Sequence, residues 1–253
     1  MESLTKATTS SKMQRLVVIA QHLRNYKRPS SSYDQMEETD AGKAVSQVGF
    51  QESVTPTIVK DVERYRPKKA AVLVCLFEGD KGDLRVILTK RASKLSTHSG
   101  EISLPGGKAE EGDKDDEETA TREAEKEIGV DPSLVEVITV LEPFLSKYLL
   151  RVVPVIGVLH NKKAFKPTLN PAEVEEVFDA PLEMCIKDEN RRVRESEWMG
   201  EKYLLHYLDY EYENKKYLIW VFTAAILIRA AAVVYQKPPA FGEGNLSSSF
   251  LGL

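Results

Sequence analysis

Cysteine and histidine are scarce in this chain. Only Cys75 and Cys185 occur among its 253 residues, with four histidines, and they show none of the spacings typical of zinc sites. Two cysteines cannot form the disulfide framework of a small secreted scaffold, so a reducing compartment is expected. Cys75 lies in the apolar run AAVLVCLF and is predicted to be a small core residue.

An excess of positive charge is also missing. The net charge is −4 at pH 7, so nucleic acid is not expected as a partner. The N-terminus lacks an apolar h-region, and no secretory signal is predicted. One apolar run, residues 217–235, approaches the length of a membrane span, but Arg229 lies inside it. A buried core helix is therefore the better interpretation, and no membrane span is expected.

The chain divides into three parts by composition. Residues 1–67 form an N-terminal extension with one amphipathic helix, from about Ser11 to Asn25, and a polar linker. Residues 68–240 form the catalytic domain, and residues 241–253 a flexible tail. Apolar residues of the N-terminal helix recur at helical spacing, at Met13, Leu16, Val17, Ala20 and Leu23.

The domain alternates strands and helices. Pro154 predicts that its strand lies at a sheet edge or contains a bulge. A short helix is predicted at 181–186, a hairpin at 203–210 and 217–220, and a core helix after it. The other predicted strands are 70–77, 84–89, 102–104, 135–141, 152–159 and 172–177.

The segment GGKAEEGDKDDEETATREAEKEIGV, Gly106–Val130, carries most of the chemistry. Glu123 and Glu127 are four residues apart, so on a helix they lie on one face. Two such carboxylates can share a hard divalent cation. The glycine turn lets backbone approach the same place, where a diphosphate could be held. The alternative is an ordinary solvated, Glu-rich helix face.

The spacing of this segment resembles the Nudix box. The matching residues are Gly107, Asp113, Arg122, Glu123, Glu127 and Gly129. Asp113 replaces a glutamate of the box, the following spacer is one residue longer, and Lys126 replaces the first glutamate of a Glu-Glu pair. The first two departures are similar to the coenzyme A diphosphatase branch of the Nudix hydrolases.

That branch also has an upstream signature, which ILTKRASKLSTHSGEISLPGG, Ile87–Gly107, resembles. Ser96 stands where arginine is common, which weakens a phosphate role for that position. From about Ser11 to Pro239 the chain is similar to plant coenzyme A diphosphatases. The resemblance implies an α/β fold: a Nudix α/β/α sandwich with a mixed sheet and a loop-helix-loop catalytic box.

The resemblance also implies a metal site. Glu123 and Glu127 are expected to bind Mg²⁺ or Mn²⁺, with the backbone carbonyl of Gly106 as a further ligand. Arg122 is expected to orient carboxylates, with Asp113 as its partner. Lys126 would repel a nearby cation, and its place in the box could cost a third metal site or a water-activating base.

The base itself stays open at this point. Glu173, Glu175 and Glu176 are candidates, although each can equally be a solvated charge at a strand end.

A basic cluster, Lys90, Arg91 and Lys94, precedes the box and could receive the 3′-phosphate of coenzyme A. The alternative is a solvated loop. His98 and Gly100 lie inside the upstream signature and are assigned to the substrate side, although His98 could equally be structural.

The expected reaction is hydrolysis of the diphosphate bond of coenzyme A or acyl-coenzyme A, giving adenosine 3′,5′-bisphosphate and 4′-phosphopantetheine or its acyl form. Lys126 keeps open a catalytically silent coenzyme A binder, and a Nudix enzyme for NADH or ADP-ribose is a further alternative. The basic, Ser/Thr-rich first 30 residues favour the mitochondrion over the cytoplasm. The sequence does not predict the oligomeric state, the acyl-chain preference or the physiological metal.

Overall fold

The computed structural model describes residues 15–29, 68–145, 150–198 and 201–241. The expected polar linker lies outside these residues, and so does the expected C-terminal tail after Phe241, which packs against the core. After a first helix over residues 15–24, the elements are β1 (Lys68–Glu78), β2 (Leu84–Arg91), β3 (Ile102–Ser103), β4 (Gly106–Lys108), α3 (Asp116–Ile128), the 3₁₀ helix η2 (Pro132–Leu134), β5 (Val135–Val140), β6 (Phe144–Leu145), β7 (Leu150–Leu159), β8 (Val174–Pro181), the 3₁₀ helix η3 (Leu182–Ile186), β9 (Arg191–Trp198), β10 (Glu201–Tyr212), β11 (Lys215–Trp220) and α4 (Val221–Tyr235).

A mixed sheet forms the centre of the described structure. Its main path runs β3-β2-β1-β7-β5, while β4, β6 and β8 pair with β1, β7 and β2. β1 is parallel to β7 and antiparallel to β2. A separate three-stranded sheet runs β11-β10-β9. The expected mixed sheet is confirmed.

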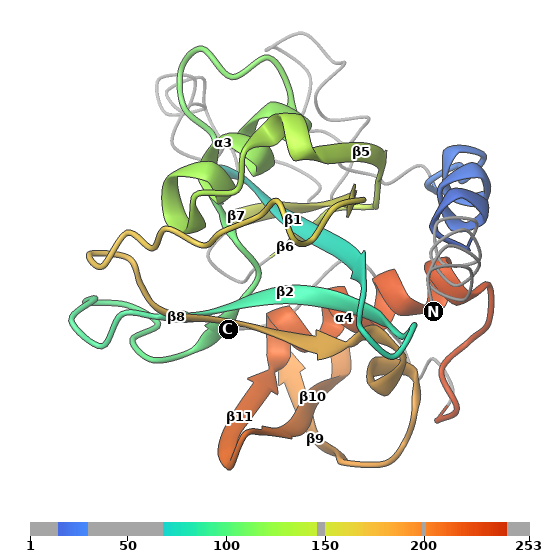
Figure 1. Ribbon diagram of the computed structural model, residues 1–253. Helices are drawn as coiled ribbons and strands as arrows, with labels where there is room; N and C mark the ends of the chain where they lie inside the picture. Colours follow the sequence, from blue (N-terminus) through green and yellow to red (C-terminus); the bar gives the residue numbers. More distant parts are fainter. Residues whose placement is uncertain (1–14, 30–67, 146–149, 199–200, 242–253) are drawn as a thin grey trace, which may run out of the picture.

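Helices cover both faces of the central sheet (Figure 1). Side chains alternate along β1 because successive residues of a strand point to opposite faces. Leu73 and Cys75 pack in the hydrophobic cluster with α3, whereas Val74 and Leu76 pack in the cluster with α4. The result is the α/β/α sandwich, and α3 lies directly over β1 and β4, next to the glycine turn.

The N-terminal helix packs on the same face as α4. Leu16 and Leu23 are buried in that core cluster, while Val17, which the periodicity put on the apolar face, is 39% exposed. Beyond the helix, the Tyr26 hydroxyl donates to Glu142 at 2.8 Å, and Arg229 of α4 pairs with the same carboxylate. The described part of the N-terminal region is therefore tied to the domain core.

Pro154 does not mark an edge strand, so the edge alternative is wrong; the β5–β7 ladder does contain an irregularity, but it lies opposite Ile156 and Gly157 rather than at Pro154. β7 lies between β1 and β5. The Pro154 carbonyl accepts from the Leu141 N–H, so its nitrogen also faces the β5 side of the strand. There β5 ends opposite Val155 and β6 begins opposite Val152. The missing N–H therefore falls where the neighbouring ladder is interrupted.

The C-terminal prediction is mostly confirmed. The hairpin β10–β11 leads into the buried helix α4, and η3 replaces the short helix expected at 181–186. The strand β9 was not predicted. None of the described helices is long and apolar enough to cross a membrane.

Candidate active site

Both ends of α3 are fixed by its own sequence. Asp115 caps the first turn by accepting from the Glu118 N–H at 2.8 Å. Gly129 ends the helix in the left-handed conformation with φ 69°, where its N–H donates to the Glu125 carbonyl. The buried residues between these caps include both Glu123 and Glu127, so the two carboxylates sit against the protein rather than on a solvated face.

The glycine turn is shaped around these carboxylates. A Cβ on Gly107 would overlap the Glu123 carboxylate, and one on Gly106 would overlap the Ala71 carbonyl. Gly106 also has φ 152°, which side-chain-bearing residues rarely adopt. Its N–H donates to Oε2 of Glu127 at 3.2 Å. The absence of side chains at both positions thus lets the turn close over the pair.

Glu127 is the more perturbed member of the pair. It is 3% exposed, and burial raises the pKa of its carboxyl from 4.5 to about 7. The Gly106 N–H and the charge of Arg91 oppose that rise, whereas Glu173 and Glu123 add to it. A buried acid surrounded by further acids calls for a compensating cation.

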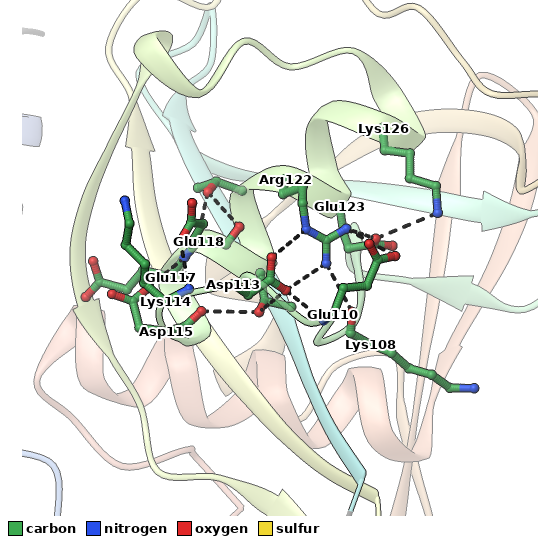
Figure 2. A network of polar contacts seen from close by, with 12 residues as sticks. Lys108, Glu110, Asp113, Lys114, Asp115, Glu117, Glu118, Arg122, Glu123 and Lys126 are labelled. Atoms are coloured by element: carbon green, nitrogen blue, oxygen red, sulfur yellow. Dashed lines mark hydrogen bonds and ion pairs between the residues drawn. The ribbon is translucent and has the colours of Figure 1, made fainter.

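Arg122 organises the other side of the site (Figure 2). Its guanidinium binds Asp113 through Nε at 2.7 Å and a terminal nitrogen at 2.8 Å. The same group pairs with Glu123 and donates to the Lys108 carbonyl at 3.2 Å. The hydrogen bonding by Arg122, together with hydrogen bonds from the Glu110 N–H and the Thr119 hydroxyl, holds the pKa of Asp113 well below its ordinary range. The expected Arg122–Asp113 contact is present in spite of the longer spacer.

Lys126 points toward the same carboxylates. Its Nζ lies 3.7 Å from Oε1 of Glu123 and 3.2 Å from Oε1 of Glu173. The hydrogen bond with Glu173 raises the pKa of Lys126, so the ammonium stays charged. A permanent positive charge therefore stands at the exposed rim of the carboxylate pair.

Of the three glutamates considered as bases, the structure brings only Glu173 to the helix. Glu175 pairs with Lys90 at 2.7 Å and with Ser93. Glu176 pairs with Lys215 at 2.6 Å.

Sequence reasoning missed Asn170, which links this loop to α3. The Asn170 N–H donates to the Glu127 carbonyl and its side-chain amide to Glu173 at 3.2 Å. The Asn-Pro pair at 170–171 is a turn signal that could have drawn attention to it.

The residues of the upstream signature lie in different environments. Lys90 binds Glu175, whereas the charge of Arg91 acts on Glu127. The buried Nε of Arg91 has no hydrogen-bond partner among the described residues. His98 is exposed and its Nδ1 contacts Glu101 at 3.0 Å, while Gly100 has φ 70°. Lys90 and Arg91 therefore have different partners, and the basic cluster that they would form with Lys94 stays a prediction.

Within the described residues, no three side chains of the His, Cys, Asp or Glu type gather as a metal cage. The chain instead offers two buried carboxylates and a backbone turn. That donor set suits Mg²⁺, which is commonly held by one or two carboxylates, waters and substrate phosphates.

Comparison with known proteins identifies the family to which this architecture belongs. The NUDIX domain family matches residues 67–201. Nudix hydrolase 15, mitochondrial, of Arabidopsis thaliana is 71% identical over 209 residues, covering 83% of this chain and 73% of that protein. Nudix hydrolase 22, chloroplastic, of the same plant is 65% identical over 90% of this chain and 76% of its own length.

A more distant relative carries a substrate in its name. The peroxisomal coenzyme A diphosphatase of Mus musculus is 34% identical over 176 residues, covering 68% of this chain and 73% of that protein. The family match spans more than half of the chain and includes the helix, the glycine turn and the carboxylate pair. The chain belongs to the Nudix hydrolase family and is an enzyme that acts on acid anhydrides.

Proposed function

We propose that the enzyme hydrolyses the diphosphate bond of coenzyme A or acyl-coenzyme A with the help of Mg²⁺ or Mn²⁺. The observation that carries the proposal is the buried pair Glu123 and Glu127 beneath the glycine turn. The upstream signature and the name of the mouse relative support coenzyme A as the substrate.

The reaction adds water across the anhydride. A bond between one phosphorus and the bridging oxygen breaks, and the hydroxyl of water joins that phosphorus. The bridging oxygen leaves with the other phosphate. The products are adenosine 3′,5′-bisphosphate and 4′-phosphopantetheine, or the acylated form of the latter.

Glu123, Glu127 and the Gly106 carbonyl would hold the cation, which supplies charge neutralisation and acidifies a water molecule. Arg122 fixes the Glu123 carboxylate, and Asp113 fixes Arg122. Both act as positioning residues, because neither needs to touch the substrate to do so.

Glu173 is our choice for the base. It faces the helix from the loop before β8, and the Asn170 amide holds its carboxylate. Its Oε1 lies 3.2 Å from the Lys126 ammonium at the rim of the carboxylate pair, where it would accept a proton from water. Glu175 and Glu176 are committed to other partners.

Coenzyme A recognition is assigned to the upstream signature. Lys90 is proposed to receive the 3′-phosphate by exchanging Glu175 for it, and Arg91 is proposed to support the diphosphate beside Glu127. His98 and Gly100 are proposed to line the substrate side of the same turn.

The test is hydrolysis of coenzyme A, dephospho-coenzyme A, NADH and ADP-ribose with Mg²⁺, with Mn²⁺ and with EDTA. Metal-dependent release of adenosine 3′,5′-bisphosphate is expected to be fastest from coenzyme A. Lys126 favours one second candidate, a silent coenzyme A binder. Binding of coenzyme A without turnover of any substrate would establish that candidate, and preference for NADH or ADP-ribose would overturn the substrate assignment.

We further propose an organellar location, with the mitochondrion preferred to the cytoplasm. The names of the two plant relatives support an organelle but differ between mitochondrion and chloroplast. Fusion of residues 1–40 to a fluorescent reporter tests the proposal. Mitochondrial signal is expected, and diffuse cytoplasmic signal would overturn it.

A further inference from the structure

Lys126 occupies a position that the hydrolytic machinery described so far does not use. It follows Glu123 by three residues on α3, and its side chain is 47% exposed where that of Glu123 is 7% exposed. In Figure 2 the ammonium reaches toward the Glu123 carboxylate from the side opposite Asp113. The lysine therefore stands at the opening of the carboxylate pair.

Two cations approach Glu123, and they differ in how firmly they are held. Arg122 is bound to Asp113 by two hydrogen bonds and to the Lys108 carbonyl by another, so it cannot leave without breaking a network. Lys126 has two carboxylate contacts, at 3.2 Å and 3.7 Å, and a long flexible stem. It can turn toward a new anion at little cost.

A lysine at position 126 changes the source of the positive charge that faces the substrate phosphates. A carboxylate there would offer a ligand for an additional cation, and that cation would attract phosphate oxygens. A lysine cannot hold a cation, but its ammonium is itself a phosphate ligand. The Lys126 side chain thus supplies a positive charge that a cation from solution would otherwise provide.

We propose that Lys126 binds the diphosphate of the substrate. When a cation neutralises the Glu123 and Glu127 carboxylates, the Lys126 ammonium leaves Glu123 and Glu173 and pairs with a non-bridging phosphate oxygen. The inference rests on the proposed function, since it needs a diphosphate at this pair. Release of Lys126 also frees Glu173 from its ion pair, which links substrate binding to exposure of the proposed base.

Binding of methylenediphosphonate, which water cannot cleave, tests this directly. Isothermal titration would compare the wild type, Lys126→Gln, Lys126→Arg and Lys187→Gln, with Mg²⁺ and with EDTA. Lys187 is the matched control, because it is 48% exposed and pairs with Glu183 at 3.3 Å on η3. Loss of a charge-assisted contact is expected to weaken binding about tenfold in Lys126→Gln. Lys126→Arg should retain most of the wild-type affinity for methylenediphosphonate, and Lys187→Gln should match the wild type.

A purely structural lysine gives a different result. If Lys126 only relieves repulsion between Glu123 and Glu173, Lys126→Gln would lower the thermal midpoint and leave methylenediphosphonate affinity unchanged, which would overturn the inference. Titration with Mn²⁺ alone adds a second readout. Lys126→Glu is expected to bind Mn²⁺ more tightly, and unchanged Mn²⁺ binding would contradict the exchange of charge.

The two proposals fail separately. A wild-type enzyme that does not hydrolyse coenzyme A but binds methylenediphosphonate through Lys126 would overturn the proposed substrate and keep the phosphate contact. Hydrolysis of coenzyme A by a wild type whose diphosphonate affinity is matched by Lys126→Gln would keep the function and remove Lys126 from it.

Discussion

The Asp113 carboxylate grips the Arg122 guanidinium with two hydrogen bonds, Nε to Oδ1 at 2.7 Å and a terminal nitrogen to Oδ2 at 2.8 Å. A bidentate pair of this kind fixes both the position and the plane of the guanidinium. The same guanidinium holds Glu123, so the aspartate acts on the carboxylate pair without touching it.

Replacing Asp113 with alanine should therefore lower activity while leaving the ligands in place. Loss of a residue that orients a ligand costs about 10- to 100-fold in comparable metal sites. We expect kcat of Asp113→Ala to fall in that range, measured as release of adenosine 3′,5′-bisphosphate under saturating Mg²⁺. Asp188→Ala, which removes an exposed partner of Arg191, is the control and should keep wild-type kcat. Equal activity in both variants would remove Asp113 from the positioning chain.

Glu127→Gln is expected to reduce turnover to near the uncatalysed rate while the fold survives. The amide keeps the shape of the carboxylate but not the charge that would hold a cation. Glu125→Gln on the exposed face of the same helix is the matched control. Circular dichroism should show both variants folded. A folded Glu127→Gln enzyme with normal hydrolysis would remove the metal assignment.

The raised pKa of Glu127 has a consequence for stability. The folded carboxyl titrates at about 7 instead of 4.5, so the folded state binds the proton more tightly than the unfolded chain. Its contribution is complete below pH 4.5 and is lost as pH rises through 7, on the order of 3 kcal/mol in total. Urea unfolding in EDTA should show the wild type losing stability relative to Glu127→Gln over that interval. A difference that does not change with pH would contradict the burial of this charge.

Much of this site follows from sequence spacing, and the reason is local. The i, i+4 separation of Glu123 and Glu127 fixes their common face on any helix, and Asp115 and Gly129 mark where that helix begins and ends. Gly107 could be recognised as part of a turn. That its missing side chain makes room for Glu123 depends on a contact across sixteen positions of the chain, which only the folded structure reveals.

Other features depend on long-range packing. The strand β9, RRVRESEW, has no apolar alternation and forms because β10 pairs with it along its length. The choice of Glu173 over its neighbours needed the loop before β8 to be placed against α3. The interior position of Pro154 needed the break between β5 and β6. None of these contacts leaves a local pattern.

The ion pair between Glu142 and Arg229 anchors the N-terminal segment and should be measurable by unfolding. Glu142 is 5% exposed and also accepts from Tyr26. Removing one member of a buried pair leaves the other uncompensated, so Glu142→Gln should lose about 3 kcal/mol of unfolding free energy. Tyr26→Phe, which removes the hydrogen bond donated to Glu142 and the one accepted from Arg229, should lose about 2 kcal/mol. Tyr212→Phe, at a tyrosine 45% exposed, is the control, and a similar loss there would show that the effect is not specific to the anchor.

The last prediction concerns the 3′-phosphate. The structure assigns Lys90 and Arg91 different surroundings, so they should be tested apart. Lys90→Gln is expected to lower kcat/KM for coenzyme A by about tenfold and to leave kcat/KM for dephospho-coenzyme A unchanged, because only coenzyme A carries the 3′-phosphate. Arg91→Gln should impair both substrates, since Arg91 acts beside Glu127. Lys187→Gln controls for loss of a surface charge. If the wild type hydrolyses both substrates equally well, Lys90 does not read the 3′-phosphate. If Lys90→Gln slows the hydrolysis of both substrates alike, Lys90 acts on a part that both share, such as the diphosphate.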